Sequence, residues 1–276
     1  MNNAFYKSPK MWKDSAVFAF ALLAGIESVM SIAAISIYDC IDSWWVRLLI
    51  IFAAYCVLIV SVFIIKYLFS RNEITLSVRG ISITVKQGDI FKAGDWKLIP
   101  FNEYYDTTVD DVVIAKNSLN GKLILEHLDN SGIAELVNTI EADDSSPFVR
   151  EYDEKAQKWR YPLGRIKTFR DYMILAFTRF NAQNEAHTTH SEYEHSLRIM
   201  WQEISRTYAN KPIHIPLVGS GITRFDDMTQ KPNSELLKCI LCTLRTSNVT
   251  INQPISILLT KDVLSTINLY ELKEVQ

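Results

Sequence analysis

A short glycine-containing stretch late in the chain has residue types that suit phosphate binding. Gly219, Ser220 and Gly221 directly follow the apolar run at residues 215–218. Glycine loses much conformational entropy in ordered backbone, so two glycines after a predicted strand indicate a close approach to that backbone. Such a loop can point several N–H groups into one concavity and hold a phosphate or diphosphate, and Arg224 can add a positive charge. A tight turn that needs glycine for a positive φ is the alternative interpretation.

Glu27 is an ionisable residue inside a long apolar segment, flanked by Ser28 and Ser31. A charge inside a membrane span is expensive and is a functional candidate by default. It can line a polar path or bind a neighbouring helix. A protonated glutamic acid that makes one interhelical hydrogen bond is the alternative. Ala21, Gly25 and Ser28 also place small residues along one helix face, which suits close helix packing.

Other reactive side chains do not complete a catalytic or metal site. Cys239 and Cys242 form a CxxC inside the helical pattern SELLKCILCTLR, and no second CxxC or histidine pair completes a zinc site. His187 and His190 are three apart, with no evident third ligand. Ser220 lacks the GxSxG spacing of a nucleophile elbow. We therefore expect no metal and no catalytic residue, and we assign Ser220 to a phosphate contact.

Two apolar runs near the N-terminus determine the class of protein. Residues 15–38 and 44–69 each exceed the roughly 20 residues that span a bilayer as a helix, and the short turn DCIDS separates them. Lysines and an arginine flank the outer ends, so the positive-inside rule puts both termini in the cytoplasm. We expect residues 1–71 to form a transmembrane hairpin in the inner membrane, with a buried soluble hairpin as the alternative. One hairpin cannot enclose a pore, so a conducting path would need several chains.

The remaining part of the chain, residues 72–276, alternates predicted strands with predicted helices. EITLSV and ISITVKQ are typical of paired strands, and PIHIPLV and PISILLT of buried strands. SEYEHSLRIMWQEISRTYA and NSELLKCILCTLRTS have the period of amphipathic helices. This alternation predicts an α/β fold with helices around a mixed sheet, in which ligands bind at the carboxyl ends of strands. The net charge of -2 gives no global attraction to nucleic acid.

Three segments, in this order, resemble those of the macro domain, the ADP-ribose-binding α/β module. QGDIF (residues 87–91) is similar to the family's early GDI stretch, which implies that Asp89 reads adenine and that Ile90 makes a backbone contact. VVIAKNSLNG (residues 112–121) is similar to the segment that approaches the distal ribose, which implies contacts from Asn117 and Ser118. IPLVGSGITRF is similar to the second phosphate loop. The resemblance assigns the following loop residues to the diphosphate and proximal ribose: Val218, Gly219, Ser220, Gly221, Ile222, Thr223, Arg224 and Phe225.

A two-helix membrane hairpin before a divergent macro domain resembles the membrane effectors of type II Thoeris antiphage systems. In that family a partner with a TIR domain consumes NAD and releases histidine-ADP-ribose. The macro domain binds this signal, the effector assembles, and the membrane is compromised. The resemblance implies a non-enzymatic homo-oligomer in a lipid bilayer, with an ADP-ribose derivative as ligand and no other cofactor.

Further expectations concern the group that is conjugated to ADP-ribose and the competing functions. Polar residues of the HTTHSEYE stretch are candidates for reading that group, with a solvated loop as the alternative: His187, His190, Glu192, Tyr193 and Glu194. One competing function is a membrane-anchored ADP-ribosyl hydrolase. It is disfavoured because SLNGKLI stands where hydrolytic macro domains carry a glycine run. The other is a scaffold whose domain only mediates contacts.

Overall fold

The structure, a computed structural model, contains two compact units that are described in turn. It describes residues 6, 8–32, 43–111, 113–142, 150–180, 186–221, 223–225 and 230–275. Residues 39–42 of the predicted DCIDS turn, and Ile222 of the predicted phosphate loop, lie outside the described residues. The first unit comprises residues 1–74 with 265–274, and the second comprises residues 75–264 with 275–276.

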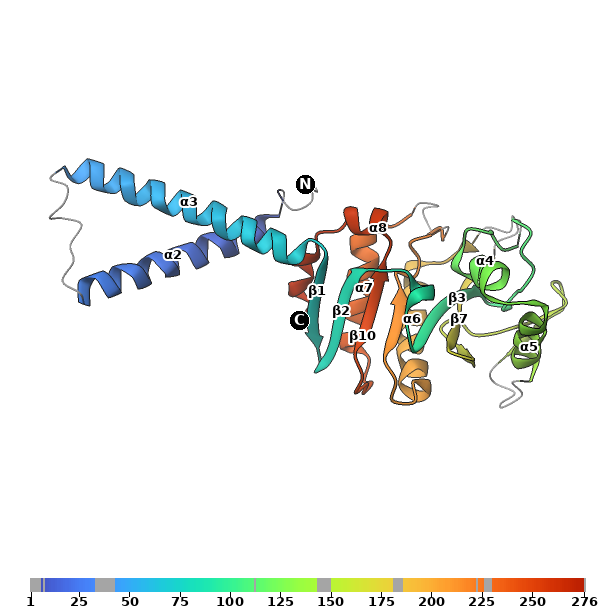
Figure 1. The fold of residues 1–276 in the computed structure, drawn as a ribbon. Helices are drawn as coiled ribbons and strands as arrows, with labels where there is room; N and C mark the ends of the chain where they lie inside the picture. The colour runs from blue at the N-terminus through green and yellow to red at the C-terminus, as the bar shows by residue number, and fades with distance from the viewer. Residues whose placement is uncertain are drawn as a thin grey trace. The chain divides into compact units, whose positions relative to one another are not determined.

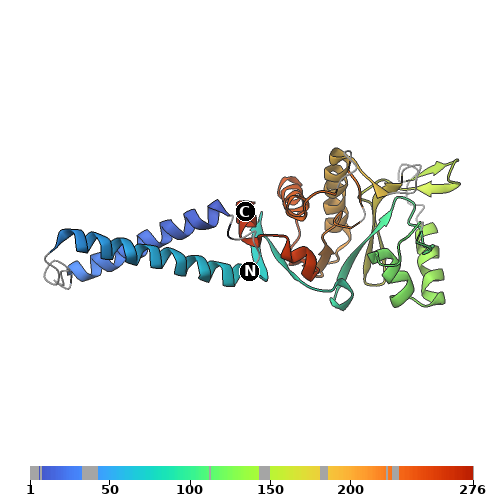
Figure 2. The ribbon, with the colours of Figure 1, turned by 90° about the horizontal axis from the view of Figure 1, so that it is seen from above.

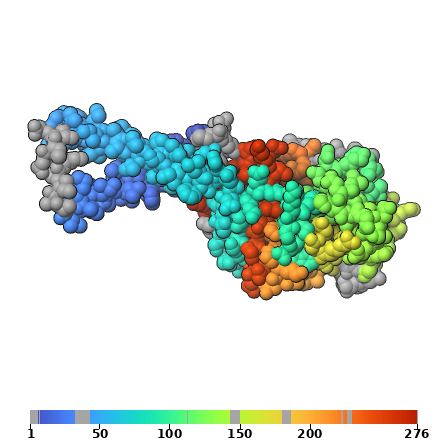
Figure 3. Space-filling view, in the orientation of Figure 1, coloured from blue at the N-terminus to red at the C-terminus, as the bar shows by residue number. Residues whose placement is uncertain are grey.

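The first unit is dominated by two long helices, α2 (Pro9–Ile32) and α3 (Trp44–Ser70). Both are long and apolar enough to cross a membrane. α2 begins upstream of the predicted span. The helices diverge toward the C-terminal end of α2 (Figures 1 and 3), and most of their large apolar side chains are exposed. Exposed apolar surface on this scale is typical of a membrane or protein contact.

The 3₁₀ helix η4 (Leu269–Glu274) packs against the other end of the hairpin. The Tyr270 hydroxyl donates a hydrogen bond to Asp14 at 2.9 Å, and Lys10 lies 3.5 Å from Glu274. Tyr270 is only 4% exposed. The C-terminal segment therefore holds α2 and α3 together where they meet. A buried cluster joins the three elements: Met11, Phe63, Tyr67 and Tyr270.

The second unit is built on an eight-stranded sheet in the order β1-β2-β10-β9-β3-β7-β6, with β8 paired to β7. Strands β2, β10, β9, β3 and β7 are parallel to one another, whereas β6 is antiparallel to β7. The mixed sheet predicted from the sequence is therefore confirmed. Its strands are β1 (Glu73–Val78), β2 (Ile81–Gln87), β3 (Trp96–Asn102), β6 (Ile166–Phe169), β7 (Tyr172–Phe180), β8 (Ala186–His187), β9 (Ile213–Pro216) and β10 (Ile255–Leu259).

Helices cover both faces of this sheet (Figures 1 and 2). On one face lie α6 (His190–Thr207) and α7 (Asn233–Thr246). On the other lie α4 (Leu119–Lys122), the π-helical turn η3 (Leu123–His127) and α5 (Asn130–Glu141). Two short strands, β4 (Glu151–Asp153) and β5 (Lys158–Arg160), pair antiparallel in a separate two-stranded sheet. The remaining short elements are η2 (Ile90–Lys92) and α8 (Lys261–Ser265).

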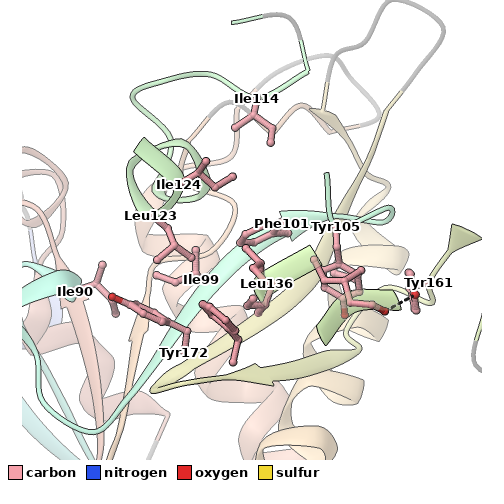
Figure 4. Packing of buried hydrophobic residues seen from close by; sticks show 14 of the residues in the cluster. Ile90, Ile99, Phe101, Tyr105, Ile114, Leu123, Ile124, Leu136, Tyr161 and Tyr172 are labelled. Carbon is pink, nitrogen blue, oxygen red and sulfur yellow. Dashed lines mark hydrogen bonds between the residues drawn. The ribbon is translucent and has the colours of Figure 1, made fainter. Parts of the chain in front are cut away.

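A buried apolar cluster fills the space between the sheet and the α4–α5 side (Figure 4). Ile99 from β3 and Leu136 from α5 are fully buried within it. Truncation of such a leucine to alanine typically costs about 2–5 kcal/mol of stability. The same cluster contains Ile90 and Ile114, which also line the cleft described below. The core therefore fixes one wall of that cleft.

Candidate ligand-binding site

A cleft of about 470 Å³ opens at the carboxyl ends of the five parallel strands. This is the edge at which open α/β sheets bind their ligands. It has the size of a small-molecule pocket. Each parallel strand contributes residues at or just after its end: Asp89 from β2, Leu259 and Thr260 from β10, Val218 to Gly221 from β9, Asn102 from β3, and Thr178 from β7.

Asp89 and Ile90 lie at the end of the cleft that is formed after β2, as predicted for an adenine site. The Asp89 side chain accepts a hydrogen bond from the Phe91 N–H at 3.1 Å and so begins η2. Its other oxygen lies 3.9 Å from Lys92, and the side chain is 51% exposed. Ile90 is buried at 4% exposure. The Phe91 ring stacks on His127 with centroids 4.1 Å apart. The Asp89 carboxylate can therefore still accept from an amino group beside an aromatic wall.

The loop after β9 presents unused backbone donors to the cleft. Within the described part of the chain, the N–H groups of Gly219 and Gly221 donate to no other residue. Both the N–H and the hydroxyl of Ser220 donate to the Leu217 carbonyl, at 3.2 and 2.6 Å. Two free N–H groups on one loop form the kind of concavity that binds anions. The Ser220 hydroxyl proton is already engaged, so the glycine amides are the better phosphate donors.

The two glycines of this loop have different physical reasons to be glycine. Gly219 has a φ of 85°, and a Cβ there would lie 2.9 Å from the Tyr193 ring. The Tyr193 hydroxyl also donates to the Val218 carbonyl at 3.0 Å. A Cβ on Gly221 would meet none of the described residues within 4 Å. The tight-turn interpretation therefore explains Gly219. The turn does not require glycine at position 221, so close approach of a ligand remains the explanation for Gly221.

Of the later loop residues 223–225, one lines the cleft and two pack behind the loop. Thr223 lines the cleft, but Arg224 and Phe225 do not. Phe225 is 1% exposed and packs against Tyr193 with ring centroids 5.4 Å apart. The Arg224 N–H donates to the Ala186 carbonyl at 2.8 Å, which joins the loop to β8. Arg224 and Phe225 thus hold the loop in place, and the expected positive charge of Arg224 is not presented to the cleft.

Asn117 and Ser118 line the cleft beside the loop that precedes α4. The Ser118 side chain accepts from the Gly121 N–H at 3.0 Å and caps α4. A Cβ on Gly121 would lie 2.4 Å from the Ala115 carbonyl oxygen, so this position requires glycine. Asn120 also lines the cleft, and its buried Oδ1 accepts no hydrogen bond from the described residues. Ser118 and Gly121 therefore shape the loop, while Asn117 and Asn120 offer side chains to a ligand.

Sequence reasoning did not identify several residues of the cleft wall. The signal was available, because a parallel strand contributes to the site where it ends. Asn102 ends β3 within IPFNEYYDT, and Thr178 stands near the end of the apolar strand DYMILAFTRFN. The unpredicted lining residues include Phe91, Asn102, Asn120, Phe177, Thr178, Leu258 and Val263.

The polar residues of the HTTHSEYE stretch do not line the cleft. Glu192 belongs to the capping box of α6 with Thr189. Tyr193 is 1% exposed, with its hydroxyl used on Val218. His190 lies 3.6 Å from Glu194 on the surface of the same helix. This stretch starts and supports a helix, and the expectation that it reads a conjugated group is not supported.

The chemistry of the lining favours binding. Among the described residues of the cleft, only Asp89 and Lys122 carry a formal charge. General acid–base catalysis usually needs a titratable group within hydrogen-bond reach of the reacting atoms. The described lining offers a single carboxylate, at one end, and backbone N–H groups in the middle.

Comparisons with known proteins found the following similarities. The family model for the macro domain of Thoeris protein ThsA matches residues 83–260. Thoeris protein ThsA from Bacillus amyloliquefaciens (strain Y2) is 37% identical over 234 residues, which cover 82% of this chain and 78% of that protein. Two structures of the Oceanobacillus iheyensis macrodomain, one with ADP and a mutant with ADPR, are 12% and 13% identical, with TM-scores of 0.45 and 0.46. Each covers 73% of this chain, and the matches span 94% and 96% of those domains.

Proposed function

This chain belongs to the Thoeris ThsA macro-domain family of antiviral defence proteins, and on that premise we propose that it is a membrane effector that senses an ADP-ribose-type signal. The proposed ligand is histidine-ADP-ribose, made from NAD by a TIR-domain partner. Binding would drive or rearrange a homo-oligomer in the inner membrane and disrupt that membrane. A ligand can do this only if it binds one state of the effector better than the other.

The loop after β9 is the observation that carries the proposal. Gly219 and Gly221, whose amides donate to none of the described residues, line a cleft that has Asp89 at one end. This order of groups suits a nucleotide diphosphate, with the adenine amino group at Asp89 and the diphosphate at the glycine amides. Asn117 and Asn120 then lie on the wall that would receive the distal ribose.

The hairpin supports the membrane part of the proposal. Its two helices are long and apolar enough to cross a bilayer. We propose that both termini face the cytoplasm, since lysines flank the outer ends of the pair and acidic residues occupy the turn. Residues 1–71 would then form the membrane part and residues 72–276 the ligand-binding part.

Titration of the full chain in lipid nanodiscs tests the ligand proposal. We expect histidine-ADP-ribose to bind, and Asp89→Ala to weaken its binding about tenfold or more, as loss of a hydrogen bond to a charged group predicts. Glu154→Ala, on the exposed surface outside the cleft, is the matched control. Unchanged affinity in Asp89→Ala would reject its adenine role, and binding of neither ADP-ribose nor the conjugate would reject the proposed function.

An ADP-ribosyl hydrolase is the alternative function. Incubation of the chain with an ADP-ribosylated protein separates the two functions, because release of ADP-ribose with turnover would contradict a pure sensor. The single carboxylate among the described lining residues favours the sensor.

A further inference from the structure

The loop after β9 is contacted by side chains of the segment that leads into α7. Gln230 Nε2 donates a hydrogen bond to the Gly221 carbonyl oxygen at 2.6 Å. The next residue, Lys231, places its Nζ 5.7 Å from the centroid of the Phe225 ring. Neither Gln230 nor Lys231 is among the residues that line the cleft. Two consecutive side chains therefore hold the loop from positions outside the cleft lining.

Gly221 lies between two backbone positions that hydrogen bonds fix. On its N-terminal side, the N–H and the hydroxyl of Ser220 both donate to the Leu217 carbonyl. On its C-terminal side, its own carbonyl accepts from Gln230. The Gly221 N–H lies between these positions and donates to none of the described residues, and Gly221 lines the cleft. The Gln230 bond therefore fixes the backbone on the side of this amide that the Ser220 bonds leave open.

Glycine at position 221 gives this second bond an energetic role. A residue without a Cβ can adopt many backbone conformations and loses more conformational entropy on ordering than any other. If the loop became ordered only when a ligand bound, the ligand would have to supply that free energy, and its affinity would be lower. A side chain that orders Gly221 beforehand removes this cost.

The same bond also influences which end of a peptide group meets an anion. Backbone N–H groups attract a phosphate, whereas a carbonyl oxygen carries partial negative charge and repels it. At glycine, rotation of the backbone has little steric cost. Because Gln230 engages the Gly221 carbonyl oxygen from outside the cleft lining, turning this oxygen toward a bound diphosphate would first break that hydrogen bond.

We propose that Gln230 is a positioning residue for diphosphate binding, which acts through the Gly221 backbone and does not itself contact the ligand. The assignment rests on the proposed function and deepens it, because it names a side chain outside the cleft that sets the affinity for the charged part of the nucleotide. Binding of the adenine group at Asp89 does not depend on it.

Titration of the full chain in lipid nanodiscs with ADP-ribose and with adenosine tests this role, with ligand-observed NMR for the more weakly bound nucleoside. Gln230→Met keeps the length of the side chain and removes its donors. We expect ADP-ribose to bind about 3- to 10-fold more weakly, the range for one lost neutral hydrogen bond. Adenosine, which has no phosphate, should keep the parent affinity. The midpoint of urea unfolding should also stay at the parent value, because Gln230 is exposed.

Gln253→Met is the matched control. Gln253 Nε2 donates to Asn210 Oδ1 at 3.4 Å. Gln253 precedes β10, at the end of the sheet opposite the cleft, and does not line the cleft. This variant removes a comparable amide donor while the Gly221 carbonyl keeps its partner, so its affinities for both compounds should equal those of the parent.

The outcomes separate this inference from the proposed function. Parent affinity for ADP-ribose in Gln230→Met would reject the positioning role and leave the proposed function intact. Equal weakening of ADP-ribose and adenosine, or a lower urea midpoint, would show that Gln230 supports the cleft or the fold as a whole, and would also overturn the assignment. If the unaltered chain binds neither ADP-ribose nor its histidine conjugate, the proposed function falls, and the assignment falls with it.

Discussion

The α/β domain and the helical hairpin each carry a glutamate in an apolar setting, and the two glutamates differ in burial and in partners. Glu103 in the domain is 3% exposed and has Arg179 as its partner. Glu27 on α2 is exposed, and within the described residues its side chain has no hydrogen-bond or ion-pair partner. In a bilayer such a residue faces the cost of an intramembrane charge.

This difference shows that the polar side chains of the domain and of the hairpin have different kinds of interaction partner. The domain supports its strained loop and pairs Glu103 with its own side chains, those of Tyr193 and Arg179. The hairpin leaves apolar faces and one carboxyl for groups outside the chain, either lipid or another copy. Changes in the domain should therefore alter ligand affinity and stability in any solvent. Changes in the hairpin should alter membrane activity alone.

The largest effect is expected from replacing Gly219, the glycine with a positive φ in the loop after β9. Gly219→Val forces a β-branched residue to a φ of 85° and a Cβ into the Tyr193 ring. We expect a loss of about 2–4 kcal/mol of unfolding free energy, from strain and a core clash, and no detectable ligand binding. Denaturant unfolding and calorimetric titration of the full chain in nanodiscs measure both effects.

Gly221→Val is the matched variant, because a Cβ there meets none of the described residues within 4 Å. We expect normal stability and at least tenfold weaker binding, since the side chain would occupy ligand space. Equal stability of the two variants would show that Gly219 is not under constraint. Binding comparable to the parent in Gly221→Val would reject the assignment of this loop to the diphosphate.

Glu27→Leu tests whether the carboxyl on α2 is needed for the membrane activity of the hairpin. Removing the carboxyl should favour insertion by about 2.5–3.5 kcal/mol, the translocon-scale cost of a charge at a helix centre. In the parent chain, ligand addition should release dye from loaded liposomes. We expect Glu27→Leu to lose this ligand-triggered release while its ligand affinity stays at the parent value. Val17→Leu, on the exposed apolar surface of α2, is the control. Normal dye release in Glu27→Leu would assign this residue a structural role.

A smaller effect is expected from the pH dependence of domain stability. Burial raises the pKa of Glu103 from 4.5 to about 7, with Arg179 and Arg160 opposing and Asp153 and Glu192 reinforcing the shift. The folded state therefore holds this proton more tightly than the unfolded state. The resulting stability is fully present below about pH 4.5, falls through the window up to about 7, and is lost above it.

Urea unfolding of the parent and Glu103→Gln at several pH values measures this contribution. The difference between the two curves should change by at most about 3 kcal/mol across the window. Parallel curves would show that the carboxyl is not held in the environment described here.

The smallest expected change comes from Tyr270→Phe at the base of the hairpin. It removes the hydrogen bond to Asp14 and should cost about 1–2 kcal/mol. Faster amide hydrogen exchange in residues 269–274 would report it. Tyr152→Phe, on an exposed side chain, serves as the control. Unchanged exchange in Tyr270→Phe would mean that apolar packing alone holds the segment.

Periodic features of the fold were predictable from the sequence, because they depend on local pattern. The apolar runs led to α2 and α3, and the strand–helix alternation led to the mixed sheet. The cleft lining was predictable only where glycine or a recognisable segment marked it, as for Asp89, Asn117 and Gly219 to Gly221.

Contacts between distant segments explain what sequence reasoning missed. Nothing local in IPFNEYYDT shows that Asn102 ends a strand beside Thr178, because that pairing joins segments far apart in the chain. Arg224 likewise looked like a phosphate ligand, but its backbone pairing with β8 places it in the support of the loop. The HTTHSEYE stretch was misinterpreted because its capping box resembles a cluster of available polar groups.

The C-terminal segment completes the unit that contains the hairpin. η4 contributes Tyr270 to the buried cluster that also contains Met11 of α2 and Phe63 and Tyr67 of α3. Because η4 follows the whole α/β unit in the sequence apart from residues 275–276, this cluster is complete only after the intervening residues have been synthesised. The final packing of the hairpin therefore depends on residues that are made after nearly all of both units.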